Sequence, residues 1–260
     1  MKPLAELRDA ARLTGLLFDI DDTLTTDGVL TAEAYGAMER LKRAGRRVVP
    51  VTGRCAGWCD QIARLWPVDA VVGENGAFWF ARDGGRIVRR YLDDAATRAA
   101  RRVRLAAIAE RILAEVPGCA LAADQPWRET DLAIDWCEDV PALPLAAAER
   151  IRALMQQAGL TAKISSIHVN GWFGTYDKLA TVKLLFAERF GTDLARSQAD
   201  YAFVGDSPND APMFAFFEHS VGVANVRRFE GKLEAAPRYV TQRACGAGFA
   251  ELAAHLLGAR

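Results

Sequence analysis

The 260-residue chain lacks several features that would each indicate a particular class of protein. Its longest apolar runs fall well short of the roughly 18 residues that a membrane-spanning helix needs, so the sequence predicts no membrane partner. Lys plus Arg total 33 and Asp plus Glu total 33. A net charge of zero gives no general attraction to nucleic acid. The first residues contain no apolar secretory segment, and we therefore expect a cytoplasmic protein.

Cysteine and histidine are scarce as well. Five cysteines without a Cys-x-x-Cys pair predict no disulfide framework. Cys55 and Cys59 are spaced to share one helical face, but no histidine lies near them in the sequence, so we expect free thiols rather than a zinc site. Only three histidines are present, and none lies near a Gly-x-Ser-x-Gly turn, which argues against a Ser-His-Asp hydrolase.

Short apolar runs alternate with helix-length segments at both ends of the chain, which predicts an α/β fold with a parallel sheet. The runs are continuously apolar, as is typical of strands buried on both faces. They lie near residues 16–18, 48–51, 68–72, 201–204 and 221–223, and the clearest helical segments are 33–44 and 179–190. Four of the five runs end in a polar turn, and three of these turns contain glycine. Because such sheets bind ligands at the carboxyl ends of their strands, we expect these turns to form one site.

The middle of the chain has a different pattern. We expect a hairpin around residues 83–85, followed by a helix at 94–116 and a strand at 131–136. A second helix at 145–158 and a second strand at 163–169 come next. This order predicts an inserted α+β domain at 82–171, between core segments 1–81 and 172–260. Arginines on the first helix alternate with acidic residues, which favours a solvated surface over a nucleic-acid-binding face.

The strongest chemical signal directly follows the first strand. Asp19, Asp21 and Asp22 place three carboxylates within four residues, and these would repel one another unless a cation neutralised them. Clustered carboxylate oxygens favour Mg²⁺. Asp19 and Asp21 could also flank one substrate atom, one as a nucleophile and the other as a proton donor. The alternative is an acidic turn that only caps a helix.

Three further segments carry groups suited to an anion or a metal. Thr52 and Gly53 lie between a strand and a helix, where a hydroxyl and backbone N–H groups can bind an anion. Lys178 opens a helix, where the helix dipole disfavours a cation unless it faces an anion. Lys183, one turn further on, is its alternative. Asp206 and Asp210 follow another strand and add two carboxylates at the same edge of the sheet.

Together these segments resemble the haloacid dehalogenase (HAD) superfamily of phosphohydrolases. The matching residues are Asp-x-Asp-x-Thr at 19–23, Thr-Gly-Arg at 52–54, Lys178, and Gly-Asp-x-x-Asn-Asp at 205–210. The insert lies where subclass IIB, which includes Cof-type and sucrose-phosphate and mannosyl-3-phosphoglycerate phosphatases, has its cap, and residues 74–77 also resemble that subclass. The resemblance implies a Rossmann-like core with a C2B-type cap. One departure is Leu179, which stands where relatives often have glycine.

The resemblance also implies a role for each matching residue. Asp19 would attack phosphorus and become an aspartyl phosphate, and Asp21 would serve as acid and then as base. Mg²⁺ would be held by Asp19, the Asp21 backbone carbonyl and Asp206, with Asp210 in support. The phosphoryl oxygens would be bound by Thr52, Gly53, Lys178 and Asn209.

The insert is expected to act as a lid that excludes water and recognises the leaving group. The candidate residues for this recognition are Arg54, Glu74, Asn75, Arg128, Glu129 and Asp131, with Trp127 and Trp172 as further candidates. The sequence thus predicts a Mg²⁺-dependent phosphatase of a small phosphorylated metabolite, favouring a sugar phosphate, that acts as a monomer or homodimer. Two alternatives stay open: a phosphomannomutase-like phosphomutase on the same scaffold, and a non-catalytic phospholigand-binding protein.

Overall fold

A computed structural model describes residues 1–8 and 10–258, and it confirms the predicted α/β fold. Its central sheet has six strands, all parallel. Their order is β1 (Lys2–Pro3), β13 (Tyr239–Val240), β12 (His219–Gly222), β11 (Tyr201–Gly205), β2 (Gly15–Phe18) and β3 (Arg47–Pro50). β2 and β11 lie side by side near the middle, and every residue of both is buried. Strands buried on both faces explain the uninterrupted apolar runs of the sequence.

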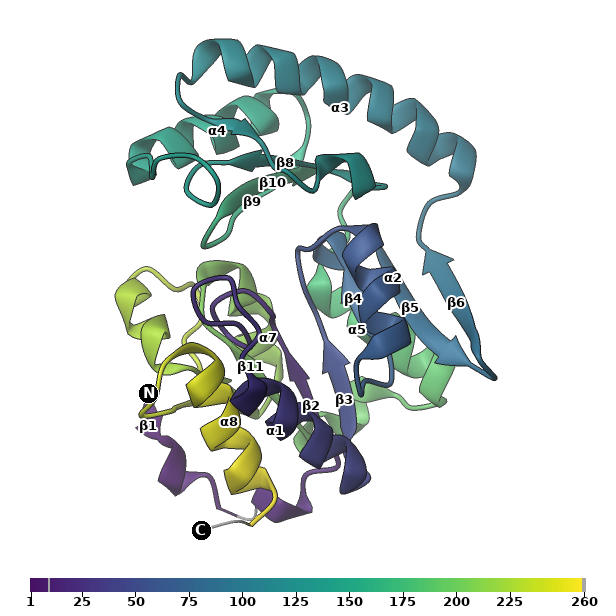
Figure 1. Cartoon of the computed structure of the whole chain (residues 1–260), viewed down its shortest axis with the longest axis vertical. Helices are drawn as coiled ribbons and strands as arrows, with labels where there is room; N and C mark the ends of the chain where they lie inside the picture. Colours follow the sequence, from purple (N-terminus) through teal and green to yellow (C-terminus); the bar gives the residue numbers. More distant parts are fainter. Residues whose placement is uncertain (9, 259–260) are drawn as a thin grey trace.

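Helices cover both faces of this sheet (Figure 1). Leu16 and Phe18 of β2 point to the face that carries α1 (Ala32–Arg43) and α8 (Cys245–Leu256). Leu17 points to the opposite face, which α5 (Lys178–Phe190) and α7 (Ala211–Phe216) cover, with the short α6 (Leu194–Ser197) beside α5. Because side chains alternate along a strand, β2 contributes to two separate apolar layers, one on each face of the sheet. No helix of the described chain is long and apolar enough to cross a membrane.

A small antiparallel sheet extends the core beyond β3. It consists of β4 (Val71–Gly73), β5 (Phe78–Asp83) and β6 (Arg86–Tyr91), and α2 (Ala56–Leu65) packs against it. The turn at Gly84 and Gly85, both with positive φ, confirms the predicted hairpin. Pro50 ends β3, and the next residue, Val51, forms a bridge with Val72 while its N–H still donates to the Phe18 carbonyl of β2 at 2.8 Å. Pairing with β4 therefore begins only after the residue that has no N–H to give.

A second antiparallel sheet lies over the carboxyl edge of the core, in the order β7 (Ala120–Leu121), β8 (Asp131–Asp135), β10 (His168–Trp172) and β9 (Thr161–Ile164). Its far face is covered by α3 (Ala95–Glu115) and α4 (Leu145–Gln157), as Figure 1 shows. The strands alternate: Leu132, Ile134 and Val169 pack under the helices, whereas the other face carries the polar residues Asp131, Asp135, His168 and Asn170 together with Ala133 and Trp172. A sheet with one apolar and one polar face fits a layer that closes over a site.

The single strand predicted at 163–169 is wrong. The structure has two strands there, β9 and β10, joined by a turn at residues 165–167. The Ser165 hydroxyl accepts the backbone N–H of His168 at 3.0 Å and makes the reversal without glycine or proline. The division into core segments 1–81 and 172–260 and a cap at 82–171 stays a prediction. Its first boundary falls inside β5 and its second inside β10.

Candidate active site

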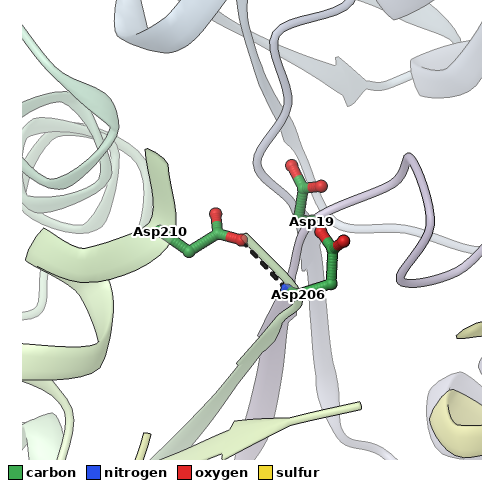
Figure 2. Close-up of side chains that lie close together, drawn as sticks. All are labelled: Asp19, Asp206 and Asp210. Carbon is green, nitrogen blue, oxygen red and sulfur yellow. Dashed lines mark hydrogen bonds between the residues drawn. The ribbon is translucent and has the colours of Figure 1, made fainter. Parts of the chain in front are cut away.

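Three carboxylates converge at the carboxyl ends of the two central strands (Figure 2). Asp19 follows β2, Asp206 follows β11, and Asp210 stands in the short turn Pro208–Asp210. Each offers an oxygen within 4.8 Å of the others, and all three residues are buried. The Asp206 N–H donates to Asp210 at 3.1 Å, the dashed line of Figure 2. A Cβ at position 205 would lie 2.3 Å from Asp210, so glycine allows this approach.

The chemistry of this cluster fits a hard divalent cation. Burial, with the nearby charges of Asp210 and Asp21, raises the pKa of Asp19 to about 7 against the opposing effect of Lys178. Burial also raises the pKa of Asp206 well above its ordinary value, with Asp19 and Asp210 adding to the effect. Buried carboxylates that repel one another are stabilised by a metal, and an all-oxygen donor set suits Mg²⁺. The residues present therefore fit the predicted cofactor.

Lys178 faces the same cluster from the first position of α5. The side chain of Asp177 caps this helix by accepting the N–H of Ala180 at 2.7 Å. Lys178 Nζ lies 2.7 Å from Asp19 Oδ1 and 2.9 Å from Asp210 Oδ1. Burial alone would lower the pKa of Lys178, but these two carboxylates raise it, so the ammonium stays charged. Lys183 lies elsewhere, with its Nζ 4.4 Å from the centre of the Phe216 ring.

Asp21 is held by an arginine from the next strand-end turn. Arg54 Nε lies 2.9 Å from Asp21 Oδ1, and Arg54 Nη2 lies 2.7 Å from the same oxygen. Arg54 Nη2 also donates to Glu138 Oε1 at 2.7 Å, and His168 Nε2 lies 2.8 Å from the other Glu138 oxygen. Burial would raise the pKa of Glu138, but His168 and Arg54 outweigh it and hold that pKa at about 2.

The remaining predicted phosphate-binding residues lie around these groups. Thr52 is fully buried, and its hydroxyl accepts the Arg54 N–H at 3.0 Å. Asn209 follows β11, and its side-chain oxygen accepts the Ser207 hydroxyl at 2.7 Å. A Cβ at Gly53 would lie 3.3 Å from the amide of Asn75, so glycine lets that side chain pack against the turn. Asn75 itself has φ 56° and a buried Nδ2 with no partner in the described chain.

A small cavity lies between these core turns and the β9–β10 turn. The core supplies Asp19, Asp21, Gly53, Arg54, Ser207 and Asn209, and the second sheet with its preceding loop supplies Arg128, Ser165, Ser166, Ile167, His168 and Asn170. The candidate nucleophile and the candidate acid thus open onto one polar space. The side of this cavity that faces the core turns is formed by residues of the insert.

Of the predicted specificity residues, Arg54 and Arg128 line this cavity, whereas Glu74, Asn75, Glu129 and Asp131 are outside the set of described residues that line it. The Glu74 carboxylate instead accepts backbone N–H groups of Ala56, Glu129 and Thr130 at 2.7–2.9 Å. It therefore fastens the insert to the turn before α2.

Arg128 makes a second fastening between the insert and the core. It pairs with Asp124 at 2.8 Å and Asp131 at 3.0 Å, and it donates to the Gly53 carbonyl at 2.9 Å. Asn170 adds a bond to Asp131 at 3.0 Å. The Arg128 side chain is fully buried, so its charge depends on these partners.

Sequence reasoning missed five polar residues that the insert contributes to this region: Glu138, Ser165, Ser166, His168 and Asn170. The last four belong to the turn and strand that the sequence pattern merged into one element. Alternation on β10 offered one signal, since His168, Asn170 and Trp172 share the face opposite Val169. Glu138 follows strand β8, but the rule about strand ends applies to parallel sheets and gave no reason to choose it.

Several residues singled out in the sequence have a structural role. Cys55 and Cys59 are buried free thiols, and burial raises the pKa of both. Trp172 is buried, and its indole N–H donates to the Tyr176 carbonyl at 3.2 Å. Trp127, in contrast, is 60% exposed.

Comparison with known proteins identifies the family of the chain. The family model of haloacid dehalogenase-like hydrolases matches residues 13–217. The chain belongs to this family. The predicted superfamily is thereby confirmed, as is the prediction that the protein is an enzyme.

Individual HAD relatives resemble the chain over nearly its whole length. Over 244 residues the chain is 28% identical to a "Phosphoglycolate phosphatase" of Methanothrix thermoacetophila. The aligned segment covers 93% of this chain and 96% of that protein. A solved Thermoplasma acidophilum protein matches with a TM-score of 0.70 at 18% identity, over 94% of this chain and 98% of that one. The sucrose-phosphatase of Synechocystis sp. PCC6803 matches with a TM-score of 0.64 at 16% identity, over 94% and 98%. At these identities the two structures demonstrate a shared fold.

Proposed function

We propose that this hydrolase is a Mg²⁺-dependent phosphatase that hydrolyses a small phosphorylated metabolite through an aspartyl phosphate on Asp19. The observation that carries the proposal is the meeting of Asp19, Lys178, Asp206 and Asp210 at the ends of β2 and β11. A carboxylate nucleophile beside a buried cation and a metal-binding cluster provides the charge neutralisation that phosphoryl transfer requires. The phosphatase name of the relative from Methanothrix supports the same reaction.

The metal would be held by Asp19, Asp206 and the backbone carbonyl of Asp21, with Asp210 in support. When bound, Mg²⁺ supplies positive charge that offsets the charge on the phosphoryl oxygens. Thr23 and Asn225 support this arrangement, because they donate to Asp206 at 3.4 and 3.2 Å and hold its carboxylate in place.

The chain's own residues would carry out two proton-coupled steps. One oxygen of Asp19 bonds to phosphorus, and the bond from phosphorus to the leaving oxygen breaks while Asp21 gives that oxygen a proton. Asp21 then takes a proton from a water molecule that attacks phosphorus, which releases phosphate and restores Asp19. Asp21 opens onto the same cavity as Asp19, which supports this pairing.

Phosphoryl oxygens would be bound by the Thr52 hydroxyl, the Gly53 backbone, the Lys178 ammonium and the Asn209 amide. Gly53 and Asn209 line the cavity, and Lys178 Nζ already contacts the nucleophile. The ammonium therefore lies beside the carboxylate that an incoming phosphoryl group would meet.

The leaving group would lie under the β9–β10 turn. Hydroxyl and amide groups of Ser165, Ser166 and Asn170 line this space, and both arginines in its wall are already paired with carboxylates. Such hydroxyl and amide groups can form hydrogen bonds with the hydroxyls of a polyol such as a sugar. The name of the relative adds glycolate as a second candidate.

We propose residues 82–171 as the cap that confers this specificity, with Arg54 and Arg128 at the wall. These two arginines would be supported from outside the cavity by Glu74, Asn75, Glu129 and Asp131. We also propose that the enzyme is cytoplasmic, that its partner is this small substrate rather than nucleic acid or a membrane, and that it acts as a monomer or homodimer.

The test is phosphate release from a panel that contains hexose phosphates, phosphoglycolate and p-nitrophenyl phosphate, with Mg²⁺. We expect release from at least one metabolite and its loss in Asp19→Asn. Asp83→Asn, at an exposed hairpin tip, is the control and should keep wild-type rates. Conversion of a hexose phosphate into an isomer without phosphate release would indicate the phosphomutase. Binding without turnover under all metals and pH values would indicate the non-catalytic protein.

A further inference from the structure

We propose that Glu138 is a positioning residue for proton transfer: the insert places it against Arg54, and Arg54 in turn orients Asp21. This inference rests on the proposed function, because it assigns Glu138 a task in the leaving-group step. The three residues form a continuous chain of contacts of 2.7–2.9 Å that crosses from the core to the insert. Glu138 and Arg54 are 84 residues apart in sequence.

The first link fixes the Asp21 carboxylate. Arg54 approaches it side-on, with Nε 2.9 Å and Nη2 2.7 Å from Oδ1, and with Nε also 3.1 Å from Oδ2. Two donors of one planar guanidinium restrict the rotation of a carboxylate far more than a single contact does. Proton transfer to a leaving oxygen requires such a fixed direction, because the acid must lie within hydrogen-bond reach of that oxygen.

The second link fixes Arg54. Its guanidinium carbon lies 4.4 Å from the centre of the Trp58 ring, which supports one face. Glu138 Oε1 accepts from Nη2, the nitrogen that also donates to Asp21 Oδ1, and the Arg54 side chain is only 6% exposed. Without Glu138, this nearly buried guanidinium would keep Asp21 as its one ion-pair partner among the described residues. Its long side chain could then turn and take the Asp21 carboxylate with it.

The third link fixes Glu138 within the insert. Asp135 ends β8, and its carboxylate accepts the backbone N–H groups of Cys137, Glu138 and Asp139 at 2.9, 2.7 and 2.8 Å. His168, opposite Asp135 on β10, places its Nε2 2.8 Å from the other Glu138 oxygen. The sheet of the insert therefore determines where Glu138 stands. Asp21 has its full support only when this sheet is seated on the core.

This role has a signature that a purely structural contact lacks. A sugar alkoxide is a poor leaving group and needs a proton as the bond to phosphorus breaks, whereas p-nitrophenolate leaves without one. A misdirected Asp21 should therefore slow sugar phosphates selectively. The ratio kcat/KM isolates this effect, since it reports only the steps up to release of the leaving group.

The experiment compares Glu138→Gln with wild type on p-nitrophenyl phosphate and on the best alkyl phosphate of the panel. We expect kcat/KM for the alkyl phosphate to fall by about tenfold or more, and that for p-nitrophenyl phosphate to change by less than about threefold. Asp139→Asn is the matched control, because it makes the same charge change in the same exposed loop, and Asp139 forms no hydrogen bond or ion pair with Arg54 in the described chain. It should leave both ratios unchanged.

Arg54→Lys provides a second variant, since an ammonium cannot grip a carboxylate side-on. It should reproduce the selective loss even if Glu138→Gln folds poorly. An equal loss on both substrates, or no loss on either, would overturn the positioning role. Absence of phosphate release by the wild-type enzyme would instead overturn the proposed function and with it the role of Glu138.

Discussion

Lys178 Nζ lies between Asp19 and Asp210, 2.7 Å from an oxygen of the first and 2.9 Å from an oxygen of the second. One ammonium at the start of α5 thus binds two of the three carboxylates that follow β2 and β11. All three residues of this contact are buried, so the interaction is little screened by water.

Replacing Lys178 by Ala should lower kcat/KM by about 100-fold or more, because the site loses a buried cation directed at the charge of the transferring group. Initial rates with p-nitrophenyl phosphate measure this. Lys183→Ala removes the same charge from the same helix, beside Phe216, and should stay within about twofold of wild type. Equal losses in both variants would contradict the placement of Lys178.

Magnesium should stabilise the wild-type protein through Asp206. At a concentration near 100 times its Kd, a ligand that binds only the folded state adds about 2.7 kcal/mol to the free energy of unfolding. Thermal unfolding with Mg²⁺ and with EDTA measures this difference, which should shrink strongly in Asp206→Asn. In EDTA the variant should match or exceed the wild type, because one of three mutually repelling carboxylates is gone. A variant that responds to Mg²⁺ as the wild type does would argue against this metal site.

Arg128 should matter for stability more than any exposed arginine of the insert. Arg128→Ala leaves Asp124 and Asp131 buried without their cation, and we expect a loss of about 3–5 kcal/mol in the free energy of unfolding. Arg111→Ala is the control: its side chain is 53% exposed, and its pairing with Glu115 should contribute less than about 1 kcal/mol. Urea unfolding of both variants decides between these values.

The contribution of Glu138 to stability should depend on pH with a definite sign. Its pKa of about 2 lies below its ordinary 4.5, so the stabilisation is complete above pH 4.5 and is lost as the pH falls toward 2. The groups that face it are Arg54 and His168, with Asp21 beyond Arg54. The gap in unfolding free energy between wild type and Glu138→Gln should narrow as the pH falls from about 4.5 toward 2. Urea unfolding over this range would count against the ion pair if the gap widened on acidification.

The core and its carboxylates could be predicted from the sequence because the relevant signals are local. Strands such as Tyr201–Gly205 are uniformly apolar, and each is followed at once by its polar turn. Parallel pairing of β2 with β11 then brings Asp19 and Asp206 together at one edge of the sheet, and this does not depend on the structure of the chain between them. Lys178 could be preferred to Lys183 for a similar reason, since only the first turn of a helix faces the strand ends.

The insert was harder to predict, for physical reasons. The reversal at Ser165 uses a side-chain hydroxyl instead of glycine or proline, so the run from Lys163 to Val169 resembles one strand. Contacts such as that of Arg54 with Glu138 depend on how the insert packs on the core. The two residues are 84 positions apart, and no local sequence pattern indicates that they meet. The same applies to Glu74, whose carboxylate holds the backbone of the insert.

The most direct test of the account is to trap the covalent intermediate. A single turnover stopped by acid, followed by borohydride reduction and peptide mass spectrometry, converts an aspartyl phosphate into homoserine at the position that carried it. We expect homoserine at residue 19 and none in Asp19→Asn. Steady phosphate release with no modification at residue 19, or with the modification at another carboxylate, would contradict the account.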